Sequence, residues 1–116
     1  MGGVHVCAHH RLDNLHLIVD DNQISMLGRT GDIVSHGSLI SRLQAFGWDC
    51  AEVDGHDVVA VQEALLRMKA QATGEPKALI ARTRKGNGVP SLEEANLSHV
   101  MNPKPELLDA LLEATK

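Results

Sequence analysis

The chain has 116 residues, enough for one domain with a hydrophobic core, and 43% of them are hydrophobic. Phe46 and Trp48 are the only aromatic residues and the formal net charge is −4, so stacking on nucleic-acid bases and binding to a polyanion are not expected. Cys7 and Cys50 form no framework of spaced pairs, the N-terminus lacks a signal-peptide pattern, and no apolar run approaches the roughly 20 residues that span a bilayer. Composition therefore predicts a soluble, intracellular domain with no nucleic-acid or membrane partner.

The first half of the chain alternates between short apolar runs and longer segments of helical spacing. Residues 8–14 look like the end of a helix, and the apolar run at 15–20 is short enough to predict a buried strand. Residues 38–49 repeat apolar side chains at helical intervals, and Gly47 is expected to end that helix. The apolar run at 50–54 predicts the second strand.

The second half continues this alternation. A helix is predicted over 57–74, with Asp57 as its N-cap, and a third strand over 77–83. The glycine- and proline-containing segment 84–105 is predicted to be a loop, and a helix with proline in its first turn closes the chain at 105–116.

Strands that alternate with helices predict a parallel sheet, so the expected fold is α/β. We expect residues 1–116 to form one partial three-layer α/β/α domain with a small parallel sheet. Because parallel sheets need both faces covered, we expect this region to be part of a larger domain. Ligands bind such sheets at the carboxyl ends of the strands. Polar or glycine-rich clusters occur at three of these ends, at 20–24, 54–57 and 83–88.

Two groups of residues that contain histidine, a set near the N-terminus and the turn around His56, are further candidates for a metal or catalytic site. His5 and His9 are four residues apart and, with Cys7, could share a helix face as zinc ligands, but no second ligand pair or recognised zinc motif accompanies them. His56 lies in a predicted strand-to-helix turn, where a structural role is favoured over a functional one. Neither group predicts a metal or catalytic site.

Three segments carry a family resemblance when taken together. They are "AHHRLDNLHLIVDDNQISMLG" at 8–28, "AFGWDCAEVDGHD" at 45–57 and "ALIARTRKGNGV" at 78–89. In this order they closely resemble the thiamine-diphosphate-binding N-terminal half of transketolases, in particular the N-terminal subunit of transketolases split into two chains. The resemblance implies a cytoplasmic enzyme of carbohydrate metabolism that uses thiamine diphosphate to transfer a two-carbon ketol unit between sugar phosphates. It also implies that the partner is a complementary half or subunit, within an oligomer.

The resemblance assigns roles to individual residues. It implies that the side-chain amide of Asn22 and the main-chain carbonyl of Ile24 bind Mg²⁺ or Ca²⁺, which bridges the protein to the cofactor's diphosphate. Oxygen ligands of this kind suit a hard cation. Asp20 and Asp21 are interpreted as supporting or turn residues beside Asn22. His99 is implied to line the cofactor channel near the diphosphate and the substrate, as a cofactor-binding and catalytic residue.

One departure from the family affects the whole interpretation. The sequence contains no "GDG" motif, so the metal-binding aspartate of that motif is missing and the chain is expected to be truncated upstream of it. The pyrimidine-binding half, with its glutamate, is missing too. The resemblance therefore implies a chain that needs a partner for activity. Two alternatives stay open: a non-catalytic remnant that acts as a binding or interaction module, and a fragment of a related enzyme such as deoxyxylulose-phosphate synthase.

Overall fold

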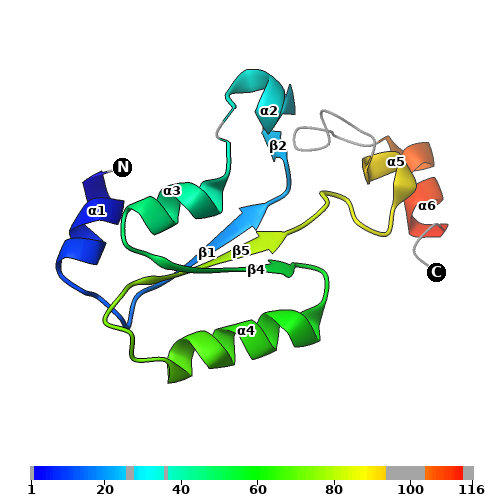
Figure 1. Ribbon diagram of the computed structural model, residues 1–116. Helices are drawn as coiled ribbons and strands as arrows, with labels where there is room; N and C mark the ends of the chain where they lie inside the picture. Colours follow the sequence, from blue (N-terminus) through cyan, green and yellow to red (C-terminus); the bar gives the residue numbers. More distant parts are fainter. Residues whose placement is uncertain (1, 26–27, 36, 94–103, 114–116) are drawn as a thin grey trace. The chain divides into compact units, whose positions relative to one another are not determined.

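The computed structural model describes residues 2–25, 28–35, 37–93 and 104–113 (Figure 1). The chain divides into two compact units. Unit 1 comprises residues 1–21 and 36–83, and unit 2 comprises residues 22–35 and 84–116.

Unit 1 holds the sheet and the helices that cover it. Its elements are α1 (Gly2–His9), β1 (His16–Asp21), α3 (Leu39–Ala45), β4 (Asp49–Asp54), α4 (Val58–Ala70) and β5 (Lys77–Arg82). The predicted strands at 15–20, 50–54 and 77–83 are confirmed, and so are the helices within 38–49 and 57–74, although both end earlier than expected. Gly47, with φ 81°, follows the end of α3 as predicted.

The sheet of unit 1 has three parallel strands in the order β1-β5-β4. The strand that comes last in the sequence therefore lies in the centre. Lys77 at the start of β5 is opposite His16 and Asp49, and Arg82 at its end is opposite Asp21 and Asp54. All three strands thus begin at one edge of the sheet and end together at the other.

Helices cover both faces of this sheet (Figure 1). On one face, Ala78 and Ile80 pack with Leu43 and Trp48, and apolar side chains of α1 and α3 complete this layer. On the other face, Leu79 packs with side chains of α4. The predicted α/β/α layering is confirmed, and it follows from the alternation of side chains along β5.

The first helix lies earlier than the sequence pattern predicts. The pattern predicts a helical end at 8–14, but α1 ends at His9 and Arg11 takes a positive φ of 54°. The reason is burial: Val4, Cys7 and Ala8 pack against the core, and the indole Nε1 of Trp48 donates a hydrogen bond to the Val4 carbonyl oxygen at 2.9 Å. Tertiary contacts therefore stabilise a helix in a glycine-containing segment of low intrinsic helix propensity.

Unit 2 contains short elements. They are β2 (Ile24–Ser25), β3 (Gly28–Arg29), α2 (Thr30–Ile33), α5 (Pro90–Glu93) and α6 (Pro105–Glu113). The helix within 105–116 is confirmed, whereas the expectation of a continuous loop over 84–105 is wrong because α5 lies inside it. That short helix is held by Glu93, whose carboxylate accepts from the Gly88 amide at 2.9 Å and from Arg84 at 2.8 Å.

The amino edge of the sheet is closed by a buried lysine. Lys77 is only 1% exposed, and its Nζ donates to the Asp13 carbonyl oxygen at 2.8 Å and to the Glu75 carbonyl oxygen at 3.4 Å. Its main-chain amide also donates to the Leu15 carbonyl oxygen at 3.0 Å. Lys77 therefore fastens the segment that leads into β1 to the first residue of β5.

The substitution Lys77→Met tests this fastening. It keeps most of the buried volume but leaves two carbonyl oxygens without their donor, so we expect the free energy of unfolding to fall by about 1–3 kcal/mol. Urea denaturation followed by circular dichroism measures the change. Lys104→Met, at an exposed position, is the control and should stay within about 0.5 kcal/mol of the wild type. Equal effects of the two substitutions would contradict the role given to Lys77.

Candidate functional site

The carboxyl edge of the unit 1 sheet is polar, as the sequence predicts. β1, β5 and β4 end side by side at Asp21, Arg82 and Asp54. The structure therefore brings together the parts of the three predicted clusters that belong to unit 1. Asn22–Ile24 and Arg84–Gly88 follow directly in the chain and belong to unit 2.

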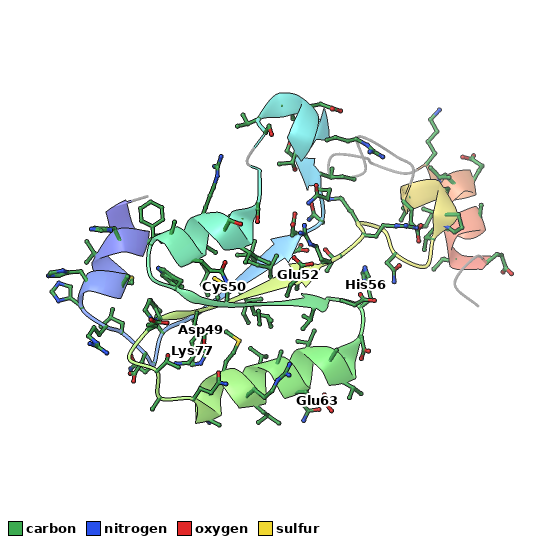
Figure 2. All side chains as sticks on the ribbon, in the orientation of Figure 1. Asp49, Cys50, Glu52, His56, Glu63 and Lys77 are labelled. Atoms are coloured by element: carbon green, nitrogen blue, oxygen red, sulfur yellow. The ribbon has the colours of Figure 1, made fainter. Side chains whose placement is uncertain are left out.

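Arg82 links all three strands at this edge. Its guanidinium forms an ion pair with Asp21 on β1 and, at 3.0 Å, with Glu52 on β4, which Figure 2 labels. The hydrogen bond with Glu52 is the main cause that raises the pKa of Arg82, and the negative charges of Asp21 and Glu52 add to it. The Arg82 side chain is half exposed, so these pairs add little stability. Their effect is to fix where β1 ends.

A second link lies on the opposite face of the sheet. The Thr83 hydroxyl donates a hydrogen bond to the Asp20 carboxylate, and the Thr83 amide donates to the Asp21 carbonyl oxygen at 3.4 Å. Both aspartates that precede Asn22 thus hold β1 against the end of β5. This agrees with their interpretation as supporting residues.

The turn after β4 is built from its own side chains. The Asp54 carboxylate accepts from the His56 amide at 2.9 Å, and the Asp57 carboxylate accepts from the amides of Val59 and Ala60 at 3.0 Å each. Asp57 is therefore the N-cap of α4, as predicted. The main chain of His56 has the structural role expected for it.

Gly55 permits a close crossing of two segments. Its amide donates to the Arg82 carbonyl oxygen at 2.7 Å, so the chain leaves β4 directly over the end of β5. A Cβ atom at this position would overlap Thr83 Cγ2 and lie 3.1 Å from both Ala81 Cβ and the Arg82 carbonyl oxygen. Only glycine fits here without displacing the edge that carries Arg82 and Thr83.

The segment Asn22–Ile24 in unit 2 forms a compact turn. The side-chain oxygen of Asn22 accepts a hydrogen bond from the Ile24 amide at 3.0 Å, and Gln23 between them has a positive φ of 61°. The Gln23 carbonyl oxygen accepts from the Thr30 amide at 2.9 Å. This turn fixes the Asn22 amide oxygen two residues before the Ile24 carbonyl in the chain, and neutral oxygens of this kind suit a hard divalent cation.

The other candidate residues belong to other parts of the chain. The described part of the chain contains no group of three or more histidine, cysteine, aspartate or glutamate residues that could hold a metal ion. His5, Cys7 and His9 therefore do not form such a group. Burial, and then the charge of Asp49, raise the pKa of the Cys50 thiol, which packs against the core. His99 lies outside the described residues.

No helix within the described ranges is long and apolar enough to cross a membrane.

Comparison with known families identifies the family to which the chain belongs. Residues 2–109 match the family described as "Transketolase, thiamine diphosphate binding domain". The chain belongs to this family. The match contains every element of unit 1 and the Asn22–Ile24 turn, so the resemblance found in the sequence is confirmed.

Individual relatives agree with this assignment. The chain is 42% identical over 94 residues to mouse transketolase-like protein 2, covering 79% of the chain and 14% of that protein. It is 34% identical over 109 residues to one of the subunits of the apulose-4-phosphate transketolase of Actinobacillus succinogenes, covering 94% of the chain and 39% of that relative. The crystal structure of Campylobacter jejuni transketolase superposes on 97% of the chain with a TM-score of 0.83 at 28% identity, and the match spans 17% of that enzyme. The chain thus corresponds to a minor part of these transketolases.

The sequence pattern does not single out Arg82 at the carboxyl edge. It places Gly55 and Thr83 in the predicted clusters at the strand ends, but it does not reveal their contacts with other strands. The missing information is the strand order, because the partners of Arg82 and Thr83 lie 30 to 63 residues away in the sequence.

The substitution Gly55→Ala tests the close crossing at this edge. Because the new methyl group would overlap Thr83, we expect the free energy of unfolding to fall by about 1–3 kcal/mol. Gly31→Ala is the matched control: a Cβ there meets no atom within 4 Å and the residue lies in α2, so that variant should be neutral or slightly more stable. Thermal denaturation of both variants measures the difference, and a neutral Gly55→Ala would show that the edge tolerates a side chain.

Proposed function

We propose that this chain supplies part of the cofactor site of a thiamine-diphosphate-dependent transketolase that transfers a two-carbon ketol unit between sugar phosphates. The observation that carries this proposal is the family match over residues 2–109, which includes the ordered Asn22–Ile24 turn. The solved transketolases that resemble the chain include the Pichia stipitis enzyme in complex with sedoheptulose 7-phosphate, in line with a sugar-phosphate substrate.

In this proposal the chain holds the diphosphate end of the cofactor through a bound metal ion. Asn22 would bind Mg²⁺ or Ca²⁺ through its side-chain oxygen, and Ile24 through its main-chain carbonyl oxygen. Asp20 and Asp21 act on this site only through the chain, since Thr83 and Arg82 fix the strand from which Asn22 follows. Thiamine diphosphate, when bound, supplies the electron sink for the transferred carbon unit. His99 is proposed to line the channel toward the substrate.

A partner is part of the proposal. Magnesium prefers six oxygen ligands in near-octahedral geometry. Two oxygens from Asn22 and Ile24 leave positions for the cofactor's phosphates, for water and for a further protein group. The match to a protein named as one of the subunits of a transketolase supports a complementary chain as the source of that group. We therefore propose a cytoplasmic oligomeric enzyme that is inactive without its complementary half.

Calorimetric titration of thiamine diphosphate with Mg²⁺ into the purified chain tests this proposal. We expect Asn22→Ala to weaken binding by about 10- to 100-fold, because an oxygen that contacts the metal is lost. Asn22→Asp keeps an oxygen for both the metal and the Ile24 amide and should retain binding. Ile24→Val is the matched control, because the proposed ligand there is a main-chain atom and its side chain can change without removing that atom.

Two outcomes would overturn the assignment. One is a folded wild-type chain that shows no metal-dependent cofactor binding, which would mean that Asn22 and Ile24 do not form a working metal site in this chain. The other is an equal loss of affinity in Asn22→Ala and Ile24→Val, which would mean that the turn contributes its shape and not an oxygen ligand.

A further inference from the structure

The sheet of unit 1 has two outer strands, and they differ in what they present at their outer edges. Within the described residues, β1 and β4 each pair with β5 on one side only (Figure 1). An outer strand carries main-chain N–H and C=O groups that can pair with another strand, and natural sheets commonly protect such an edge with charged residues. The two edges of this sheet can be compared residue by residue.

The main-chain groups at the β1 edge follow from the pairing of β1 with β5. The carbonyl oxygens of Leu15 and Asp21 accept hydrogen bonds from main-chain amides at the start of β5 and just past its end. In a parallel ladder the main chain of every second residue faces the same neighbour, so Leu17 and Val19 also face β5. The N–H and C=O of Ile18, between them, therefore point to the outer edge.

The side chains in the middle of β1 are apolar on both faces of the sheet. Leu17 and Val19 pack against the core on the face that α1 and α3 cover. Ile18 lies on the other face, opposite Leu79, and is 56% exposed because α4 packs on β4 and β5. Ile18 thus combines an exposed apolar side chain with main-chain groups that face outward.

The matching position of β4 carries a charge. The amides of Asp49 and Gly55 donate to carbonyl oxygens just before β5 and at its end, so the main chain of Glu52 faces the outer edge by the same alternation. Glu52 is labelled in Figure 2. Two copies of β4 paired edge to edge about this residue would place two glutamates opposite each other, and like charges in that position are unfavourable. The β4 edge is therefore protected by a charge, and the centre of the β1 edge is not.

We propose that β1 pairs with β1 of a second copy of this chain, antiparallel and centred on Ile18. In this register the Ile18 residues of the two copies are opposite each other, and each N–H donates to the carbonyl oxygen of the other. Leu17 is opposite Val19 of the second copy, and His16 is opposite Asp20 of the second copy. The register therefore pairs apolar residues with apolar ones and brings no like charges opposite each other.

Other registers are less favourable. A shift by one residue would put Ile18 opposite Val19 of the second copy, whose main chain faces β5 and whose side chain lies on the other face of the sheet. Centring the pair on Asp20 would put two carboxylates opposite each other, and centring it on His16 would leave Ile18 opposite Asn14 of the second copy. The proposal does not rest on the proposed function, because no metal or cofactor takes part in the contact.

Sedimentation velocity of the full chain, from low to high micromolar concentration, tests the proposal. We expect a monomer–dimer equilibrium with a micromolar dissociation constant, since a single strand pair is smaller than a standard protein interface. Ile18→Glu gives β1 the charge that β4 already has, so dimerisation should weaken by about tenfold or more. Leu66→Glu is the matched control: Leu66 lies on α4 and is 58% exposed, so this variant should dimerise like the wild type. Both variants should keep the circular dichroism spectrum of the wild type, because both side chains are more than half exposed.

Amide hydrogen exchange locates the contact within the chain. Exchange at the Ile18 amide should slow several-fold as the protein concentration rises, because the second copy supplies its acceptor. The amides of Leu17 and Val19 face β5 and should exchange slowly at every concentration. In Ile18→Glu the amide at position 18 should exchange quickly throughout.

Four results would overturn the proposal. The first is a monomer at every concentration, and the second is a dimer that Leu66→Glu disrupts and Ile18→Glu leaves intact, which would assign the contact to α4. The third is protection of the Ile18 amide that does not depend on concentration, because the edge would then be covered within one chain. The fourth is assembly beyond the dimer, since pairing at one edge closes with two copies. None of these measurements uses thiamine diphosphate, so a failed cofactor titration would leave them unaffected.

Discussion

The parallel pairing of β5 with β1 on one side and β4 on the other is the interaction on which unit 1 depends. β5 is the last strand in the sequence, yet Lys77 to Ala81 are buried and take the central place. Its side chains alternate between a layer with α1 and α3 and a layer with α4. Because both faces must be apolar, polar chemistry is confined to the two ends of the strand.

Those two ends are used differently. At the carboxyl end, Arg82 and Thr83 fasten the two aspartates of β1, and the metal-binding turn proposed at Asn22–Ile24 begins at the next residue. At the amino end, the buried ammonium of Lys77 fastens the segment that leads into β1. One strand thus sets the position of β1 at both of its ends.

The chain matches only a minor part of each solved transketolase, and this has a physical consequence for the proposed site. A match spanning 17% of the Campylobacter jejuni enzyme superposes with a TM-score of 0.83, so the local fold is the family's. A cation held by one amide oxygen and one carbonyl oxygen needs further ligands. The proposed function therefore joins the layered fold of unit 1 to an incomplete ligand set, which is why it includes a complementary chain.

The sequence by itself determined the elements whose signals are local. Apolar runs predicted β1, β4 and β5, helical spacing predicted α3 and α4, Asp57 was recognised as an N-cap, and three motif segments taken together indicated the family. It placed the first helix wrongly and missed α5, since α1 is stabilised by contacts with Trp48 and the core and α5 by Glu93 contacts that its spacing does not reveal. Only the tertiary structure decided that β5 lies between β1 and β4, that Gly55 crosses Arg82, and that Lys77 is buried at the amino edge. These features depend on contacts between residues far apart in the chain, and local periodicity carries no information about which distant strand will be the neighbour.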